Sequence, residues 1–205
     1  MSSGAITANI EKERRIIMSE AARKEYKIDA IRKSLKNLNT IAYPRSVEEV
    51  FSLGIGFQYF IGSIYMEIAE CRTTKQKGEF VRLALRQMDI KDKIVKLANA
   101  NLNNVLRYFY ENGGPVIETR VEEIDKGKQS FFDKLIINCL QQVDIVVEIA
   151  LKGEMAASEV EKAINGYFVD LYTDLGKLVS SGQIKNAYAQ LIEVRMNQPA
   201  DNRAC

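Results

Sequence analysis

Helix-breaking residues are scarce in this chain and fall at only a few points. The 205 residues include three prolines and twelve glycines, so few positions force the backbone to turn. Between the breaks, apolar residues recur every three or four positions, which is the repeat of an amphipathic helix. No window alternates apolar and polar residues as a half-buried strand would. The pattern predicts an all-α fold, a bundle of five to six helices with a long N-terminal amphipathic helix.

The breaks divide the chain into three predicted parts. Residues 1–45 form an N-terminal arm that ends at Pro44, 46–196 form the bundle, and 197–205 form a polar tail. Within the bundle we expect helices that begin near residues 46, 78, 118, 158 and 183. Two pairs have the spacing of a capping box, in which side chains bond the first backbone N–H groups of a helix. These pairs are Ser46 with Glu49 and Ser158 with Glu161.

The N-terminal arm carries apolar residues at intervals of three, four and seven, which predicts a seam along one helix face. Lys24 lies on the same face and interrupts it. Such a helix packs either against its own bundle or against a neighbouring chain, and both alternatives stay open. The residues of this predicted self-association seam are Ile10, Ile17, Ile28, Ile31 and Leu35.

Two later segments are strongly apolar. The run 50–66 contains no charged residue, but its length is at the lower limit for a membrane span, so we expect a buried core helix and no membrane span. The run 135–151 is apolar on more than one face, so we expect this helix to be central. This run belongs to a helix predicted over about 118–151, whose core-facing stripe is Val121, Ile124, Phe131, Leu135, Cys139, Val143, Val146 and Ala150.

The chain contains no histidine. This excludes Ser-His-Asp and Cys-His nucleophilic sites and histidine-ligated metals. No phosphate-binding glycine motif is present. We therefore expect no conventional catalytic centre and no cofactor. Cys71, Cys139 and Cys205 are odd in number and far apart, which indicates a reducing, intracellular compartment, and we expect a cytoplasmic protein.

Four carboxylates form the one arrangement with potential enzymatic chemistry. Glu67 and Glu70 are three residues apart, and Asp89 and Asp92 repeat that spacing on the next predicted helix. Two antiparallel helices could gather them around Mg²⁺, which prefers oxygen ligands. The arrangement resembles the ExxE…ExxD motif of the all-α nucleoside-triphosphate pyrophosphatases related to MazG, although Asp89 stands where that family has Glu. The resemblance implies metal binding by these four residues and phosphate contacts from Arg82 or Arg86. The alternative to a metal site is a solvent-exposed helix face, on which these carboxylates form local ion pairs.

Charge is distributed unevenly along the chain. Residues 71–110 hold nine Lys and Arg against three Asp and Glu, whereas 111–180 hold seven against thirteen. Opposite charges of this kind can be neutralised within a bundle or can join copies head to tail. A basic row on the predicted third helix could contact nucleic-acid phosphates or could simply be a solvated face. The row consists of Lys75, Arg82, Arg86, Lys93 and Lys96.

Together these features predict a non-enzymatic structural or adaptor protein. Its expected partners are further copies of the chain or other protein subunits in a larger assembly, such as a coat or filament. The first alternative is a nucleic-acid-associated subunit that uses the basic row. The second is a magnesium-dependent nucleotide pyrophosphatase that uses the four carboxylates.

Overall fold

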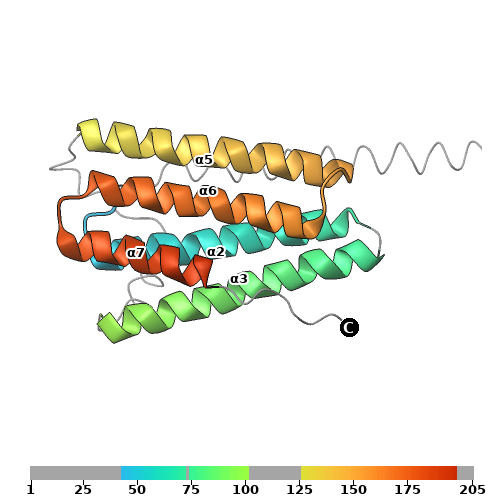
Figure 1. Cartoon of the computed structure of the whole chain (residues 1–205), viewed down its shortest axis with the longest axis horizontal. Helices are drawn as coiled ribbons and strands as arrows, with labels where there is room; N and C mark the ends of the chain where they lie inside the picture. Colours follow the sequence, from blue (N-terminus) through green and yellow to red (C-terminus); the bar gives the residue numbers. More distant parts are fainter. Residues whose placement is uncertain (1–42, 73, 102–125, 198–205) are drawn as a thin grey trace, which may run out of the picture.

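The computed structural model describes residues 43–72, 74–101 and 126–197. They form five α-helices and no strand: α2 (Val47–Glu70), α3 (Thr74–Asn101), α5 (Lys126–Lys152), α6 (Ala157–Leu178) and α7 (Gly182–Met196). The all-α prediction is therefore confirmed for the described residues. The predicted N-terminal helix, its seam and the tail from residue 198 lie outside them. Short turns join α2 to α3, α5 to α6 and α6 to α7, and the helices lie side by side (Figure 1).

The two predicted capping boxes have different outcomes. Ser46 caps α2 as expected, because its Oγ accepts a hydrogen bond from the Glu49 N–H at 3.2 Å. The second prediction is wrong: Ser158 lies inside α6, and Ala156 is the N-cap residue. The Glu159 carboxylate accepts a hydrogen bond from the Ala156 N–H at 2.9 Å. That bond satisfies one of the backbone donors at the helix start, so the cap serine is not needed.

Helix α2 is the centre of the described bundle. It packs against α3, α5 and α7, and its Phe57 ring contacts Phe168 of α6 at a centroid distance of 4.9 Å. Because neighbours surround it, every residue from Val50 to Gln58 is buried. The expected core helix is therefore confirmed. Gly54 lets α7 approach closely, since an added Cβ there would lie 2.7 Å from Leu191 Cδ2.

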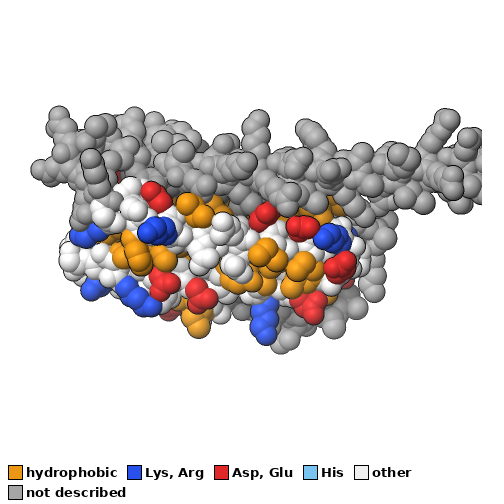
Figure 2. Space-filling model, turned by 90° about the horizontal axis from the view of Figure 1, so that it is seen from above, with side chains coloured by type: hydrophobic (Ala, Val, Ile, Leu, Met, Phe, Trp, Pro, Cys, Tyr) orange, Lys and Arg blue, Asp and Glu red, His pale blue; other side chains and the backbone are white. Residues whose placement is uncertain are grey.

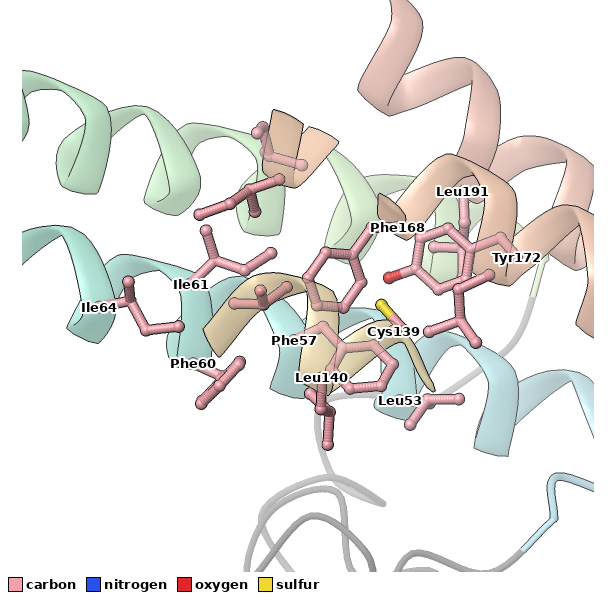
Figure 3. Packing of buried hydrophobic residues seen from close by; sticks show 14 of the residues in the cluster. Leu53, Phe57, Phe60, Ile61, Ile64, Cys139, Leu140, Phe168, Tyr172 and Leu191 are labelled. Atoms are coloured by element: carbon pink, nitrogen blue, oxygen red, sulfur yellow. The ribbon is translucent and has the colours of Figure 1, made fainter. Parts of the chain in front are cut away.

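The hydrophobic core is one cluster, to which all five described helices contribute side chains. Phe57 and Leu53 of α2, Cys139 and Leu140 of α5, and Phe168 of α6 all point into this region (Figure 3). Tyr172 and Tyr188 continue it, with ring centroids 6.4 Å apart. Burial of this apolar surface, at roughly 25 cal/mol per Å², is the main force that holds the helices together.

Helix α5 lies at the edge of the described bundle, which corrects its predicted central place. It packs chiefly on α6 and makes a smaller contact with α2. The predicted core stripe is also partly wrong, because Phe131 is 49% exposed and Phe132 is buried instead. Cys139, Val143, Val146 and Ala150 are buried as expected. A helix that is apolar on two faces can occupy the edge of a bundle, and α5 then leaves one of these faces exposed.

Candidate self-association surface on helix α5

A second uncharged stripe runs along α5 beside its buried face. Its members are spaced by four, three, four, three and four residues, which is the heptad pattern of a coiled-coil seam. At 3.6 residues per turn, this stripe is centred about 120° around the helix from the buried face. We call it the α5 seam, and it consists of Phe131, Leu135, Asn138, Gln142, Ile145 and Ile149.

The α5 seam is accessible from outside. Phe131 and Ile145 are 49% and 52% exposed, and both rank among the large hydrophobic side chains that the fold leaves at its surface. Asn138 is also exposed, while Leu135, Gln142 and Ile149 are partly buried. Viewed from the α5 side, apolar side chains emerge between charged ones (Figure 2). Exposed apolar residues scattered singly are ordinary, but aligned at heptad spacing they indicate a surface for a second helix.

The described bundle gives the α5 seam no partner helix, because α5 packs on α6 and α2 through its other face. The Cys139 thiol donates to the Tyr167 carbonyl of α6 at 3.7 Å. At the start of the helix, the Phe132 ring packs edge-on against Tyr43 at 5.8 Å. Cys139 and Phe132 are outside the α5 seam, and Leu135 is the seam member that packs against the core.

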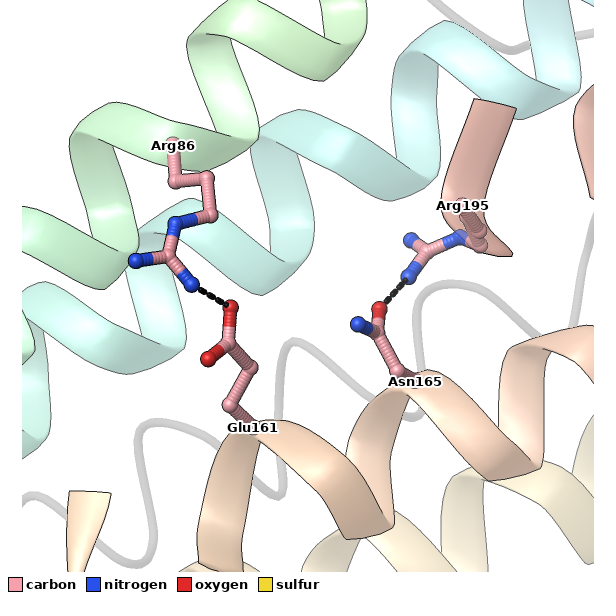
Figure 4. Close-up of polar contacts among 4 residues, drawn as sticks. All are labelled: Arg86, Glu161, Asn165 and Arg195. Atoms are coloured by element: carbon pink, nitrogen blue, oxygen red, sulfur yellow. Dashed lines mark hydrogen bonds and ion pairs between the residues drawn. The ribbon is translucent and has the colours of Figure 1, made fainter. Parts of the chain in front are cut away.

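Polar groups inside the bundle lock the helices together. The guanidinium of Arg195, only 2% exposed, donates to Asn165 Oδ1 at 2.6 Å and to Gln58 Oε1 at 3.0 Å. It also lies 4.9 Å from the Phe168 ring centroid. These contacts join α7 to α6 and α2, and Figure 4 shows the bond to Asn165. The cation has neutral hydrogen-bond partners and an aromatic face, which suits a structural role.

The buried titratable groups are poor nucleophiles and bases. Burial raises the pKa of the Cys139 thiol to about 12 and that of Tyr172 to about 12. Burial also raises the pKa values of Tyr65 and Tyr188 well above the ordinary tyrosine value. A reactive cysteine needs a lowered pKa. These residues therefore stay protonated at neutral pH and act as packing groups.

Their raised pKa values predict a loss of stability in alkali. Above the ordinary values of 9.0 for cysteine and 10.0 for tyrosine, the unfolded chain releases protons that the folded chain retains. The stability that these groups contribute is therefore fully present below about pH 9 and is lost as pH rises. Thermal unfolding at pH 7.5 and 10.5 measures the loss. The loss of stability between these two pH values should be smaller by about 1 kcal/mol in Tyr188→Phe than in the wild-type chain. An equal loss in the variant and the wild type would contradict the assignment of a raised pKa to Tyr188.

The four predicted magnesium ligands do not come together. Within the described residues, no three Cys, Asp or Glu side chains are close enough to hold a metal ion. The helix register explains why. Gly62 of α2 faces Ala84 and Gln87 of α3, so Glu67 lies about 10 Å along the helix axis from the level of Asp89. The site implied by the resemblance to the pyrophosphatases is therefore not formed.

The basic row is divided by the packing of α3. Arg82, Lys93 and Lys96 are exposed. Arg86 instead forms an ion pair with Glu161 of α6 at 2.5 Å, in which the two side chains are 21% and 17% exposed (Figure 4). Arg86 thus helps to hold α3 against α6. The side chain of Lys75 lies outside the described residues, and binding of nucleic acid by the row stays a prediction.

Comparison with known protein families, with curated proteins and with solved structures finds no significant match. The functional argument therefore depends on this chain's own residues. Among the described helices, none is both long and apolar enough to cross a membrane. The predicted seam in residues 1–45 cannot be compared with the α5 seam, because its residues lie outside the described part of the chain.

Proposed function

We propose that this chain is a non-enzymatic structural or adaptor subunit that self-associates within a larger assembly. The α5 seam is the observation that carries the proposal. It supplies an uncharged, heptad-spaced face that is accessible at Phe131 and Ile145, while the core of the described bundle is completed by other faces. Coiled-coil seams are buried against a partner helix in stable proteins.

Three further features support assembly over catalysis. The chain lacks histidine, and burial raises the pKa values of Cys139 and Tyr172 to about 12. The N-terminal arm carries a second predicted seam, at Ile10, Ile17, Ile28, Ile31 and Leu35. A subunit with two separate association surfaces can build assemblies larger than a dimer, as coats and filaments require.

Light scattering on the full chain over a hundredfold range of concentration tests this proposal. We expect masses above the 23.2 kDa monomer, which increase with concentration as mass action requires. Measurements at low and high salt show how much charge contributes. A monomeric mass at every concentration and salt would contradict self-association.

The nucleic-acid alternative depends on the exposed part of the basic row, at Arg82, Lys93 and Lys96. A gel-shift assay with generic RNA and DNA tests it, because phosphate contacts give binding that weakens steeply with salt. Salt-sensitive binding that is lost in a triple Arg82→Ala, Lys93→Ala, Lys96→Ala variant would favour this alternative.

A further inference from the structure

The α5 seam has the same order of apolar and amide side chains when it is read in either direction along the helix. Taken outward from Leu140, the members form three pairs, and the two members of each pair are equally far from Leu140. The outer and middle pairs are apolar, whereas the inner pair consists of two amides. These pairs are Phe131 with Ile149, Leu135 with Ile145, and Asn138 with Gln142.

This symmetry is what an isologous contact between two identical helices requires. In a twofold contact, residue i of one copy meets residue j of the other, and j meets i. Two antiparallel copies of α5 that cross at the level of Leu140 would place each member of the α5 seam against its pair in the other copy. Leu140 itself is buried in the core, at 4% exposure, on the opposite side of the helix. Apolar side chains would then meet apolar ones. Asn138 would meet the partner's Gln142, and both amides can donate and accept hydrogen bonds.

Charges beside the α5 seam agree with the same arrangement. Lys134 and Glu148 flank the seam on the same side of the helix, at equivalent heptad positions. An antiparallel twofold contact keeps that side common to both copies and brings Lys134 within about 3 Å, along the helix axis, of the level of the partner's Glu148. Each dimer would contain this ion pair twice. The Glu148 carboxylate already accepts a hydrogen bond from Lys152 at 2.8 Å, and an exposed carboxylate can be shared between two lysines.

We infer that the partner of the α5 seam is a second copy of this chain, packed antiparallel, with the twofold axis on the seam side of the helix at the level of Leu140. The inference rests on the proposed function and makes it specific. Central amides fix the register of such pairs, because a shifted register would leave them against apolar side chains. Contact with an unrelated helix would not require the α5 seam to have the same order of side-chain types in both directions.

Disulfide cross-linking between two variants, each with one introduced cysteine, tests the geometry. One variant carries Asn138→Cys and the other Gln142→Cys, with a fusion tag on one of them to separate the mixed dimer on a gel. Cys71 and Cys205 are replaced by serine in both. Cys139 stays, because it is only 7% exposed and burial raises its pKa to about 12. Each variant is first checked for helical content and thermal unfolding.

Cross-linking is expected in the mixture and not in either variant alone, since only positions 138 and 142 face each other. Equal or stronger linkage of Asn138→Cys to itself would mean parallel helices and would overturn the inference. A mixture with Leu85→Cys, an exposed position on α3 at 61% exposure, serves as the control and should not link.

The outcomes separate this inference from the proposed function. Absence of cross-links in a chain that light scattering shows to self-associate would overturn the α5 pairing and leave self-association standing. A monomeric wild-type chain would overturn both.

Reversal of the flanking charges gives an independent check. Lys134→Glu should weaken dimerisation by about tenfold, and adding Glu148→Lys to it should restore most of the loss. No recovery in the double variant would contradict the predicted ion pair.

Discussion

Replacement of Arg195 by alanine should destabilise the bundle by about 3 kcal/mol. Arg195 is 2% exposed, and its removal leaves the side-chain oxygens of Asn165 and Gln58 without the donors that bond them at 2.6 and 3.0 Å. It also leaves a void beside the Phe168 ring. A buried acceptor without a donor typically costs about 1–3 kcal/mol. Urea unfolding followed by circular dichroism measures the change.

Arg86→Ala is the matched control for this prediction. Arg86 also forms a bond between helices, at 2.5 Å to Glu161, but its side chain is 21% exposed. Water can solvate the groups left behind, so we expect a loss of only about 1 kcal/mol. Arg195→Lys should fall between the two alanine variants, because an ammonium keeps the charge but not the planar fork that reaches both amides. Equal losses for Arg195→Ala and Arg86→Ala would contradict the structural role of Arg195.

Replacement of Phe132 by alanine should cost about 3–5 kcal/mol. Its side chain is fully buried, and its ring packs against Tyr43 at 5.8 Å. Phe131→Ala should change the stability of the monomer by about 0.5 kcal/mol or less, because Phe131 is 49% exposed. The same urea titration, at a concentration low enough to keep the chains monomeric, measures both variants. The reverse order would mean that α5 is rotated relative to the described structure.

Helix periodicity was enough to predict the class of fold. The scarcity of glycine and proline predicts helices, and the predicted helix starts near residues 46 and 183 agree with the starts of α2 at Val47 and of α7 at Gly182. The uncharged run 50–66 predicts a core helix, and α2 occupies the centre of the described bundle. In each case a local property of the sequence determines the result.

The orientation of α5 could not be predicted in this way. Phe131 and Phe132 are adjacent and equally apolar, so periodicity allows either to face the core. The contacts with α6 and Tyr43 decide between them, and these are contacts between segments far apart in sequence. The magnesium prediction is wrong for the same reason, because contacts between distant segments decide it. Spacing places Glu67 and Asp89 on neighbouring helices, but the register of α2 against α3 separates them.

The α5 seam became recognisable only when the buried face was known. The core stripe predicted from the sequence includes two of its members, Phe131 and Leu135, and this assignment hides the second stripe and its symmetry about the level of Leu140. Arg195 was missed for a related reason. It is the one arginine of α7, and nothing in its local sequence shows that it is buried against Gln58 and Asn165.

Sedimentation equilibrium of the wild-type chain beside Ile145→Lys and Leu85→Lys tests self-association through the α5 seam most directly. Both substitutions add one lysine at an exposed apolar position, with 52% and 61% exposure. We expect a wild-type mass at least twice 23.2 kDa, the same mass for Leu85→Lys, and a lower mass for Ile145→Lys, because a charge in a helix-pair seam opposes its burial. A wild-type mass of 23.2 kDa at every concentration, or an Ile145→Lys mass equal to that of wild type, would contradict it.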